Sequence, residues 1–158
     1  MFLNIPLKKQ IWKIAAIGLG LIISIIIIHI MQFLNLTLYK IPDGMDLTVP
    51  QSYEDFLKTN PLFLIGILFS NIFGSFTGGA IAKLTHYSVS ILMAGWVGFV
   101  LIILEIYNLI AVEYPVWFWI LTVALYIPSA WAGAYFVVIN QQKNEDILES
   151  RDQRKAKS

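Results

Sequence analysis

The chain of 158 residues is 58% hydrophobic and only 13% charged. This balance lies well outside that of soluble globular domains, so lipid is expected to be the solvent of most of the chain. The sequence contains no cysteine, which excludes disulfides, thiolate metal sites and oxidoreductases built on a Cys-x-x-Cys pair.

Four continuous apolar runs are each long enough to cross the roughly 30 Å hydrocarbon layer of a bilayer as an α-helix. Helices are favoured over the strands of a membrane barrel, because lipid-facing strands alternate between apolar and polar residues. The runs cover about residues 11–34, 61–82, 89–110 and 116–139. The predicted fold class is therefore all-α: a polytopic membrane protein in which residues 1–140 form a compact antiparallel bundle of four transmembrane helices.

The first run follows Lys8 and Lys9, a basic start that also occurs in cleaved signal peptides. At about 24 residues, the run exceeds the apolar core of a signal peptide, and it ends without a small-residue cleavage site. We expect it to be retained as a membrane anchor.

Residues 35–60 form the only sizeable connection between the apolar runs, and they contain a polar turn. Pro42 fixes φ and Gly44 accepts a positive φ, so the shape of the turn needs no ligand. The carboxylates of Asp43 and Asp46 nevertheless make this stretch a candidate binding site in the outer loop. The alternatives are a loop that folds back over the membrane helices and a loop that points into solvent.

A short amphipathic helix is expected in the second half of the same loop. Tyr53, Phe56 and Leu57 fall on one face of such a helix, which predicts a segment that lies on the outer membrane surface. Asn60 then precedes a proline, a pair typical of a side-chain cap followed by proline in the first turn of the next helix.

Every apolar run carries small residues on one face, where helix backbones can approach closely. Lipid tails are as apolar as leucine, so such contacts matter more for packing than apolar burial does. The glycines expected at helix contacts are Gly74, Gly78, Gly79, Gly95, Gly98 and Gly133. Short turns at about residues 83–88 and 111–115 also predict that the helices they join lie side by side.

Four polar residues within the apolar runs are candidates for an intramembrane site: His29, Asn71, Glu105 and Asn108. Ionisable groups are costly in hydrocarbon and normally face the interior of a bundle. His29 and Glu105 both fall in the outer half of the bilayer, about 8 to 11 Å beyond its midplane at a rise of 1.5 Å per residue. At that depth the two side chains are candidates for a pair.

Two interpretations of these residues remain open. In one, Glu105 and His29 form a proton- or ligand-linked site that opens outward. In the other, Glu105 and Asn108 lie close enough to the interface to be solvated or to cap outer loops. Asn71 is expected to hydrogen-bond between helices. No metal site is expected, because the only other histidine, His86, lies on the opposite side of the membrane in this topology.

Positive charge gathers on one side of the predicted topology. Of the 11 Lys and Arg residues, three precede or open the first run, one joins the second run to the third, and five follow the fourth. Basic residues in short loops are retained in the cytoplasm, so both termini are expected there. Residues 141–158 hold few large apolar side chains and are expected to form a polar cytoplasmic tail that extends the last helix.

Three stretches carry a further likeness. They are Pro42-Asp43-Gly44-Met45-Asp46 in the outer loop, Gly74-Ser75-Phe76-Thr77-Gly78-Gly79 in the second run, and Pro115-Val116-Trp117-Phe118-Trp119 at the start of the fourth. With them, about residues 40–136 resemble a family of bacterial four-helix membrane proteins. The resemblance implies a location in the bacterial inner membrane, and it implies no particular activity because none is assigned to that family.

The pattern of polar residues contains no catalytic constellation, and no cofactor or nucleic-acid partner is expected. The expected function is that of a non-enzymatic interaction or accessory bundle, whose partners are the lipid bilayer and either a second copy of the chain or another membrane protein. The alternative is a small proton-coupled transporter or channel that uses Glu105 and His29. A membrane enzyme built on Asp43, Asp46 and Glu105 is a third possibility, without a nucleophile and base to support it.

Overall fold

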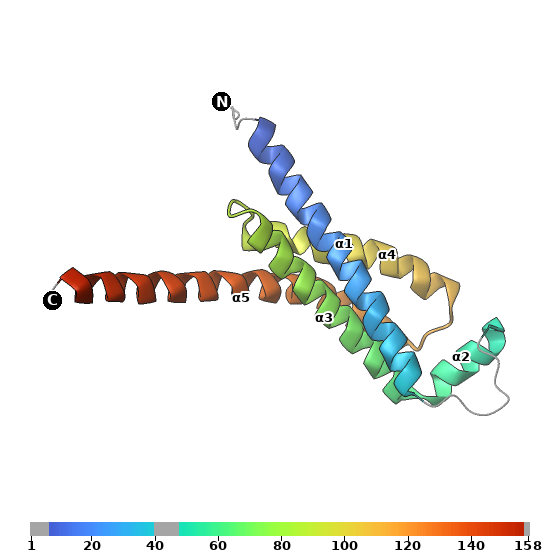
Figure 1. Ribbon diagram of the computed structural model, residues 1–158. Helices are drawn as coiled ribbons and strands as arrows, with labels where there is room; N and C mark the ends of the chain where they lie inside the picture. Colours follow the sequence, from blue (N-terminus) through green and yellow to red (C-terminus); the bar gives the residue numbers. More distant parts are fainter. Residues whose placement is uncertain (1–6, 40–47, 157–158) are drawn as a thin grey trace.

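The computed structural model describes residues 7–39 and 48–156, which are almost entirely helical (Figure 1). The helices are α1 (Leu7–Leu38), α2 (Pro50–Thr59), α3 (Pro61–Thr85), α4 (Ile91–Ala111) and α5 (Val116–Ala156). Four of them, α1, α3, α4 and α5, are long and apolar enough to cross a membrane. The prediction of an all-α bundle of four transmembrane helices, with a short helix in the first loop, is confirmed.

Proline and serine mark the starts of several helices. Proline stands in the first turn of both α2 and α3, where its missing N–H has no helical partner to lose. The Ser90 hydroxyl caps α4 by accepting a hydrogen bond from the Met93 N–H at 3.2 Å. The predicted capping role of Asn60 for α3 is wrong. Its amide donates to the Phe56 carbonyl at 2.9 Å, because the free carbonyls at the end of α2 lie within its reach.

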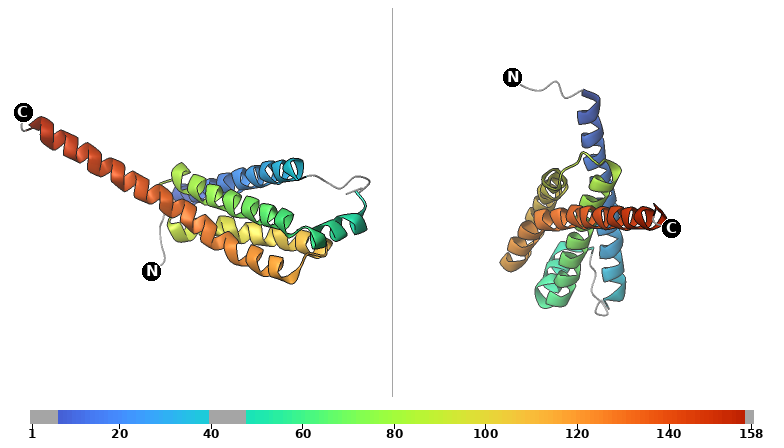
Figure 2. Two further views of the ribbon diagram at one scale, coloured as in Figure 1. Left: turned by 90° about the horizontal axis from the view of Figure 1, so that it is seen from below. Right: turned by 90° about the vertical axis from the view of Figure 1, so that its left-hand side faces the viewer.

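The last helix is longer than the apolar run that predicts it. α5 continues past residue 139 to Ala156 and projects from the bundle as a single helix (Figure 2). The side chains of residues 139–150 are all exposed. The polar end of the chain therefore continues α5 as a helix as far as Ala156, and this extension is solvated over residues 139–150.

α3 is the central helix of the bundle. It packs along its length against α1 and α5, and α4 packs mainly against α5 (Figures 1 and 2). The short turn after Thr85 predicts that α3 and α4 lie side by side. The two helices do touch, but each of them makes more contact with α5 than with the other. Among the spanning helices that touch, α1 and α4 make the slightest contact. This leaves a seam between α1 and α4.

Glycines stand where α1 and α3 approach most closely. Gly74 faces the Ile28 side chain, and Gly78 faces Ser24 and the Gly20 carbonyl. A Cβ atom at either position of α3 would overlap these atoms. The contact between α1 and α3 therefore depends on the absence of side chains, as is usual for helices packed in lipid.

The contacts of α5 with α3 and α4 follow the same rule. Gly79 of α3 lies against the Ala130 backbone, and Gly98 of α4 lies against the backbone of Tyr126 and Ile127. The remaining glycines at these contacts are Gly95, against the Trp131 indole, and Gly133, against the Phe76 carbonyl. All six glycines expected at helix contacts thus lie between helices of the same chain.

The sequence pattern predicts that the apolar face of α2 lies on the membrane surface. In the structure this face is instead covered by the bundle. Phe56 and Leu57 are fully buried, in a cluster with Phe63 of α3, Leu109 of α4 and Phe118 of α5. Three helix ends meet here and leave an apolar hollow, and filling it removes more apolar surface from water than contact with headgroups would. We call this end of the bundle, where α1 and α4 finish and α3 and α5 begin, the α2 end.

Gly79→Ala is expected to destabilise the bundle by about 1–3 kcal/mol, because the added methyl group would press on the Ala130 backbone and force α3 and α5 apart. The control is Gly18→Ala in α1, where no atom lies within 4 Å of the added group. This exchange should be neutral or slightly stabilising, since alanine is the better helix former. Thermal unfolding in mild detergent compares the two. Equal melting temperatures would contradict the packing described.

Candidate functional site

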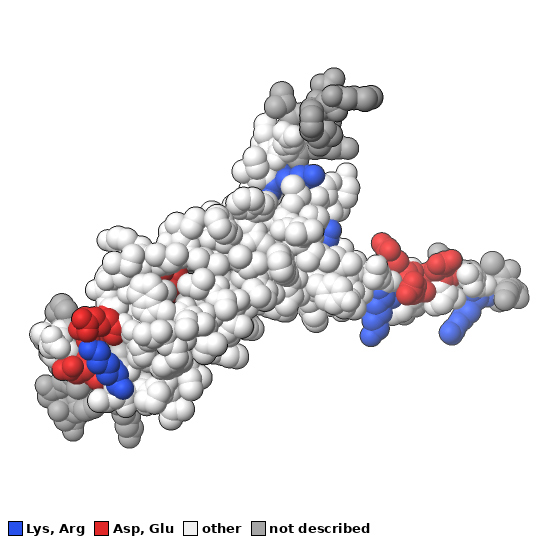
Figure 3. All heavy atoms as spheres, turned by 180° about the vertical axis from the view of Figure 1, so that it is seen from behind, with Lys and Arg blue, Asp and Glu red and all other residues white. Residues whose placement is uncertain are grey.

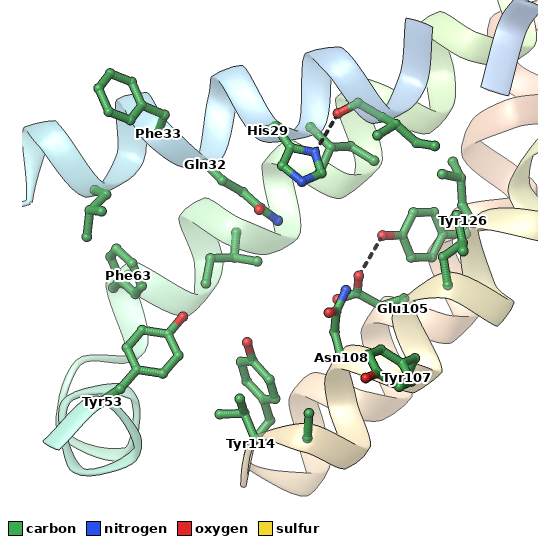
Figure 4. A pocket seen from close by; sticks show the side chains of 18 residues that line it. His29, Gln32, Phe33, Tyr53, Phe63, Glu105, Tyr107, Asn108, Tyr114 and Tyr126 are labelled. Carbon is green, nitrogen blue, oxygen red and sulfur yellow. Dashed lines mark hydrogen bonds between the residues drawn. The ribbon is translucent and has the colours of Figure 1, made fainter. Parts of the chain in front are cut away.

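A cavity of about 760 Å³ opens at the α2 end of the bundle, in the seam between α1 and α4 (Figure 4). Side chains of α1 and α4 form its two walls. Phe63 and Ile67 of α3 and Tyr126 of α5 form its floor, and Tyr53 of α2 closes one end. The cavity is thus lined by all five helices.

The cavity results from the way α4 is held. Gly95 and Gly98 bring the first half of α4 against α5. Further along the same face, Leu101 and Glu105 follow at helical spacing, and both are too large for contact between backbones. In its second half α4 runs away from α1 (Figure 1), and side chains line the gap between the two helices instead of filling it.

Four side chains from four helices form a hydrogen-bonded network beside the cavity. Gln32 of α1 donates to the side-chain oxygen of Asn71 in α3 at 3.3 Å. The Asn71 amide in turn donates to Oε1 of Glu105 in α4 at 3.3 Å. The Tyr126 hydroxyl of α5 donates to Oε2 of the same carboxyl group at 3.3 Å (Figure 4). Each oxygen of Glu105 thus accepts a hydrogen bond from a different neighbouring helix.

Glu105 is the only acidic residue within the four apolar runs. Figure 3 shows charged side chains gathered at the ends of the molecule and, between them, one acidic patch in a hollow of an uncharged surface. Among the described residues, no Lys or Arg lines the cavity, and the ion pair between Lys58 and Glu113 lies outside it. The carboxyl group of Glu105 is therefore partnered by neutral donors instead of a counter-ion.

His29 and Asn108 also line the cavity. Nδ1 of His29 lies 2.8 Å from the carbonyl oxygen of Ile25 in its own helix. In the described part of the chain, His29 forms no ion pair with Glu105, because the two side chains stand on opposite walls of the cavity (Figure 4). Asn108 lies one turn after Glu105 on the same wall. The hydrogen bonds from Asn71 and Tyr126 thus take the place of the expected pair.

The sequence pattern did not point to Gln32, Tyr126 or the tyrosines at the closed end of the cavity. Gln32 left a usable signal, since it follows His29 by three residues and so shares its helix face. Tyr126 left no signal in the sequence, because its role depends on which helix faces α5.

The hydroxyls of Tyr53 and Tyr114 point toward one another (Figure 4). Burial raises the pKa of both phenols, which keeps them neutral.

Polar contacts fasten α2 to the turn between α4 and α5. Nζ of Lys58 lies 2.9 Å from Oε2 of Glu113, and the Glu54 carboxylate accepts a hydrogen bond from the Glu113 N–H at 3.4 Å. The hydrogen bond from Lys58 lowers the pKa of the Glu113 carboxyl, and the same contact raises the pKa of Lys58. Both groups are exposed, so the pair adds little stability but holds the last turn of α2 in place.

The two outer-loop candidates, Asp43 and Asp46, lie outside the described residues. Within residues 7–39 and 48–156, no three His, Asp or Glu side chains lie close enough together to hold a metal ion. His86 lies in the turn between α3 and α4, at the end of the bundle opposite the cavity, where its Nδ1 accepts a hydrogen bond from the Ser88 N–H at 3.2 Å.

No protein-family model, curated protein or solved structure matches the chain. The resemblance carried by the outer loop, α3 and the start of α5 therefore stays a prediction.

Tyr126→Phe removes one of the two donors to Glu105 and keeps the ring that packs against Val97 and Leu101. It is expected to destabilise the protein by about 0.5–1.5 kcal/mol, the range for hydrogen bonds between membrane helices. Tyr135→Phe, at an exposed position of the same helix, is the control and should leave stability unchanged. Reversible unfolding in detergent compares them. An equal effect of both exchanges would show that the Tyr126 hydroxyl does not stabilise the site.

The contact between Lys58 and Glu113 gives a pH dependence with a definite sign. A carboxyl group with a lowered pKa stabilises the fold above its unfolded pKa, about 4.3, and this stabilisation is lost as the pH falls through the folded value. The contribution of Lys58, whose pKa is raised, is present below about pH 10.4 and is lost as the pH rises through its folded value. The pair is therefore intact between about pH 5 and 10.

Lys58→Met should raise the midpoint of the Glu113 titration toward the ordinary carboxyl range, because the cation that favours the ionised form is gone. NMR of the labelled carboxyl group measures this midpoint. Lys143→Met, on the exposed extension of α5, is the control and should leave it unchanged. A midpoint that stays the same in Lys58→Met would count against the attachment of α2 described here.

Proposed function

We propose that this chain is an integral membrane protein that binds one amphipathic small molecule in the cavity at the α2 end, without transforming it chemically. The placement of Glu105 supports this most. Its carboxyl group meets two neutral donors beside an open cavity of about 760 Å³. Ionisable groups at membrane depth mark functional sites, because their burial is costly unless it serves a purpose.

The size and lining of the cavity suit such a ligand. Ligand sites in proteins measure roughly 300–1,000 Å³ and combine apolar walls with a few fixed polar groups. Here Ile25, Leu36 and Leu104 supply apolar surface, while Glu105 and Asn108 supply polar groups. The seam between α1 and α4 gives a molecule dissolved in the membrane a sideways route to the polar groups.

An interaction or accessory bundle, the function expected from the sequence, has less support from the packing. The small-residue stripes suggested association with a second copy or another membrane protein. In the bundle, Gly78 contacts α1, and Gly79 and Gly98 contact α5. These glycines are used inside the chain and give no separate support to association between chains.

A small proton-coupled transporter or channel is the second candidate, and one observation favours it. On the other side of the cavity from α2, Gly20, Gly78 and Val97 bring α1, α3 and α4 together. The bundle is thus open in the half that holds the cavity and closed in the other half. Such an arrangement suits a binding site near mid-membrane that is reached from one side of the membrane at a time. Transport also requires a second state that opens to the other side.

We further propose that the cavity faces the outer side of a bacterial inner membrane and that both termini are cytoplasmic. Lys13 and Lys83 stand at the end of the bundle opposite α2, and Lys143 and Arg154 stand on the extension of α5. Figure 3 shows basic residues on these parts of the molecule. Basic residues next to membrane helices favour the cytoplasmic side, which supports this orientation.

Native mass spectrometry from lipid nanodiscs tests the proposed function with dodecylamine, dodecanol and dodecanoate as probes. At least one probe should be retained at one molecule per chain. Leu104→Trp, which enlarges a side chain of the cavity wall, should weaken retention about tenfold or more. Ile120→Trp, at an exposed position of α5 outside the cavity, is the control and should not.

Failure of all three probes to bind, or an equal loss in both tryptophan variants, would overturn the proposed function. The same proteins in proteoliposomes test the second candidate. Movement of a retained probe across the membrane that stops in Glu105→Gln would establish transport, and retention without movement would leave binding alone.

A further inference from the structure

We propose that the amphipathic ligand is a cation, with an amine or quaternary ammonium group beside Glu105 and a hydrocarbon tail that leaves through the seam between α1 and α4. This proposal rests on the proposed function and narrows it to one class of ligand. The charge balance of the cavity, its aromatic lining and its apolar seam carry the proposal.

The charge balance of the cavity favours a cation. Oε1 and Oε2 of Glu105 each accept a hydrogen bond, and both donors, Asn71 and Tyr126, are neutral. An ammonium group beside this carboxyl would favour its ionised form, since an opposite charge within about 4–6 Å stabilises that form. No Lys or Arg among the described residues lines the cavity. An ammonium group would supply the counter-charge that a carboxylate needs where water is scarce.

An anionic head group fits the same site poorly. A phosphate or carboxylate would stand beside Glu105 with no Lys or Arg on the described walls to offset either negative charge. His29 is the one group on these walls that can gain a positive charge. It stands on the wall opposite Glu105, and its Nδ1 is engaged with the Ile25 carbonyl (Figure 4). The site is therefore built for positive charge.

Aromatic rings from several helices line the cavity that the carboxylate borders (Figure 4). The face of an aromatic ring attracts a cation within about 6 Å of its centre, and aromatic cages are the usual protein sites for quaternary ammonium groups. The rings that line the cavity belong to Phe33, Tyr53, Phe63, Tyr107, Tyr114 and Tyr126. A carboxylate within such a set of rings can hold an ammonium group by ion pairing and by ring contacts together.

The mouth of the cavity suits a hydrocarbon tail. Leu36 and Leu104 line the two walls at the seam and are exposed. A tail that lies between them continues into the lipid region alongside α1 and α4. Lipid is as apolar as these side chains, so contact between the tail and the seam adds little affinity over contact with lipid. The tail therefore guides the ligand to the site, and the head group supplies the selectivity.

The test uses the full-length protein in nanodiscs of uncharged lipid and four probes with the same twelve-carbon tail: dodecyltrimethylammonium, dodecylamine, dodecanol and dodecanoate. Native mass spectrometry gives the dissociation constant of each. The two cations should bind about tenfold or more tightly than dodecanol and dodecanoate. Glu105→Gln should remove this preference and leave dodecanol binding within about twofold, which also shows that the variant is folded.

Two further variants sharpen the result. Glu113→Gln removes the same charge at the same end of the bundle but outside the cavity, so it should preserve the preference for cations. Glu105→Asp keeps the charge and should retain most of the preference, even if its stability is reduced.

Equal binding of the four probes would overturn the cationic class and leave the proposed function intact. A cation preference that survives in Glu105→Gln, or that Glu113→Gln abolishes equally, would also overturn it. Binding of none of the probes would overturn the proposed function itself.

Discussion

Where two helix backbones of this bundle come closest, glycine stands between them. α3 turns Gly74 and Gly78 toward α1 and Gly79 toward α5. In lipid, the burial of apolar side chains gives helices little reason to associate, so contacts between bare backbones decide which helices touch. α4 carries Gly95 and Gly98 in its first half, and both face α5. α4 is therefore held by α5 and touches α1 only lightly, which leaves the seam that the cavity occupies.

The cavity and its chemistry follow from the same constraint. Past its glycines, α4 presents Glu105 to the gap beside α1, and the carboxyl group reaches Asn71 and Tyr126, which α3 and α5 hold in position. α2 closes the end of the gap with Tyr53, and Phe56 of the same helix is buried in the core beside it. The result is a polar centre in an apolar and aromatic chamber that is open along a helix seam. This arrangement accounts for the proposed binding of an amphipathic ligand and for its expected positive charge.

The sequence predicts the four spanning helices well, because continuous apolarity is a local signal that needs no knowledge of neighbours. Glu105 and Asn71 could also be singled out, since polar side chains at membrane depth are rare and costly. Their hydrogen bond could not be predicted, because it depends on how α3 and α4 are turned toward one another. Tyr126 could not be found for the same reason. The covered face of α2 and the redirected amide of Asn60 were missed because both respond to the meeting of helix ends, which no local pattern describes.

Labelling of single cysteines tests whether an open cavity lies beside Glu105, since the natural chain contains no cysteine. Asn108→Cys and Leu109→Cys place a thiol at adjacent positions of α4, the first on the cavity wall and the second in the core, where Leu109 is 1% exposed. We predict that a small water-soluble maleimide labels Asn108→Cys, that dodecyltrimethylammonium slows this reaction, and that Leu109→Cys stays unlabelled in the folded protein. Equal labelling of the two thiols, or no labelling of folded Asn108→Cys, would contradict the open cavity.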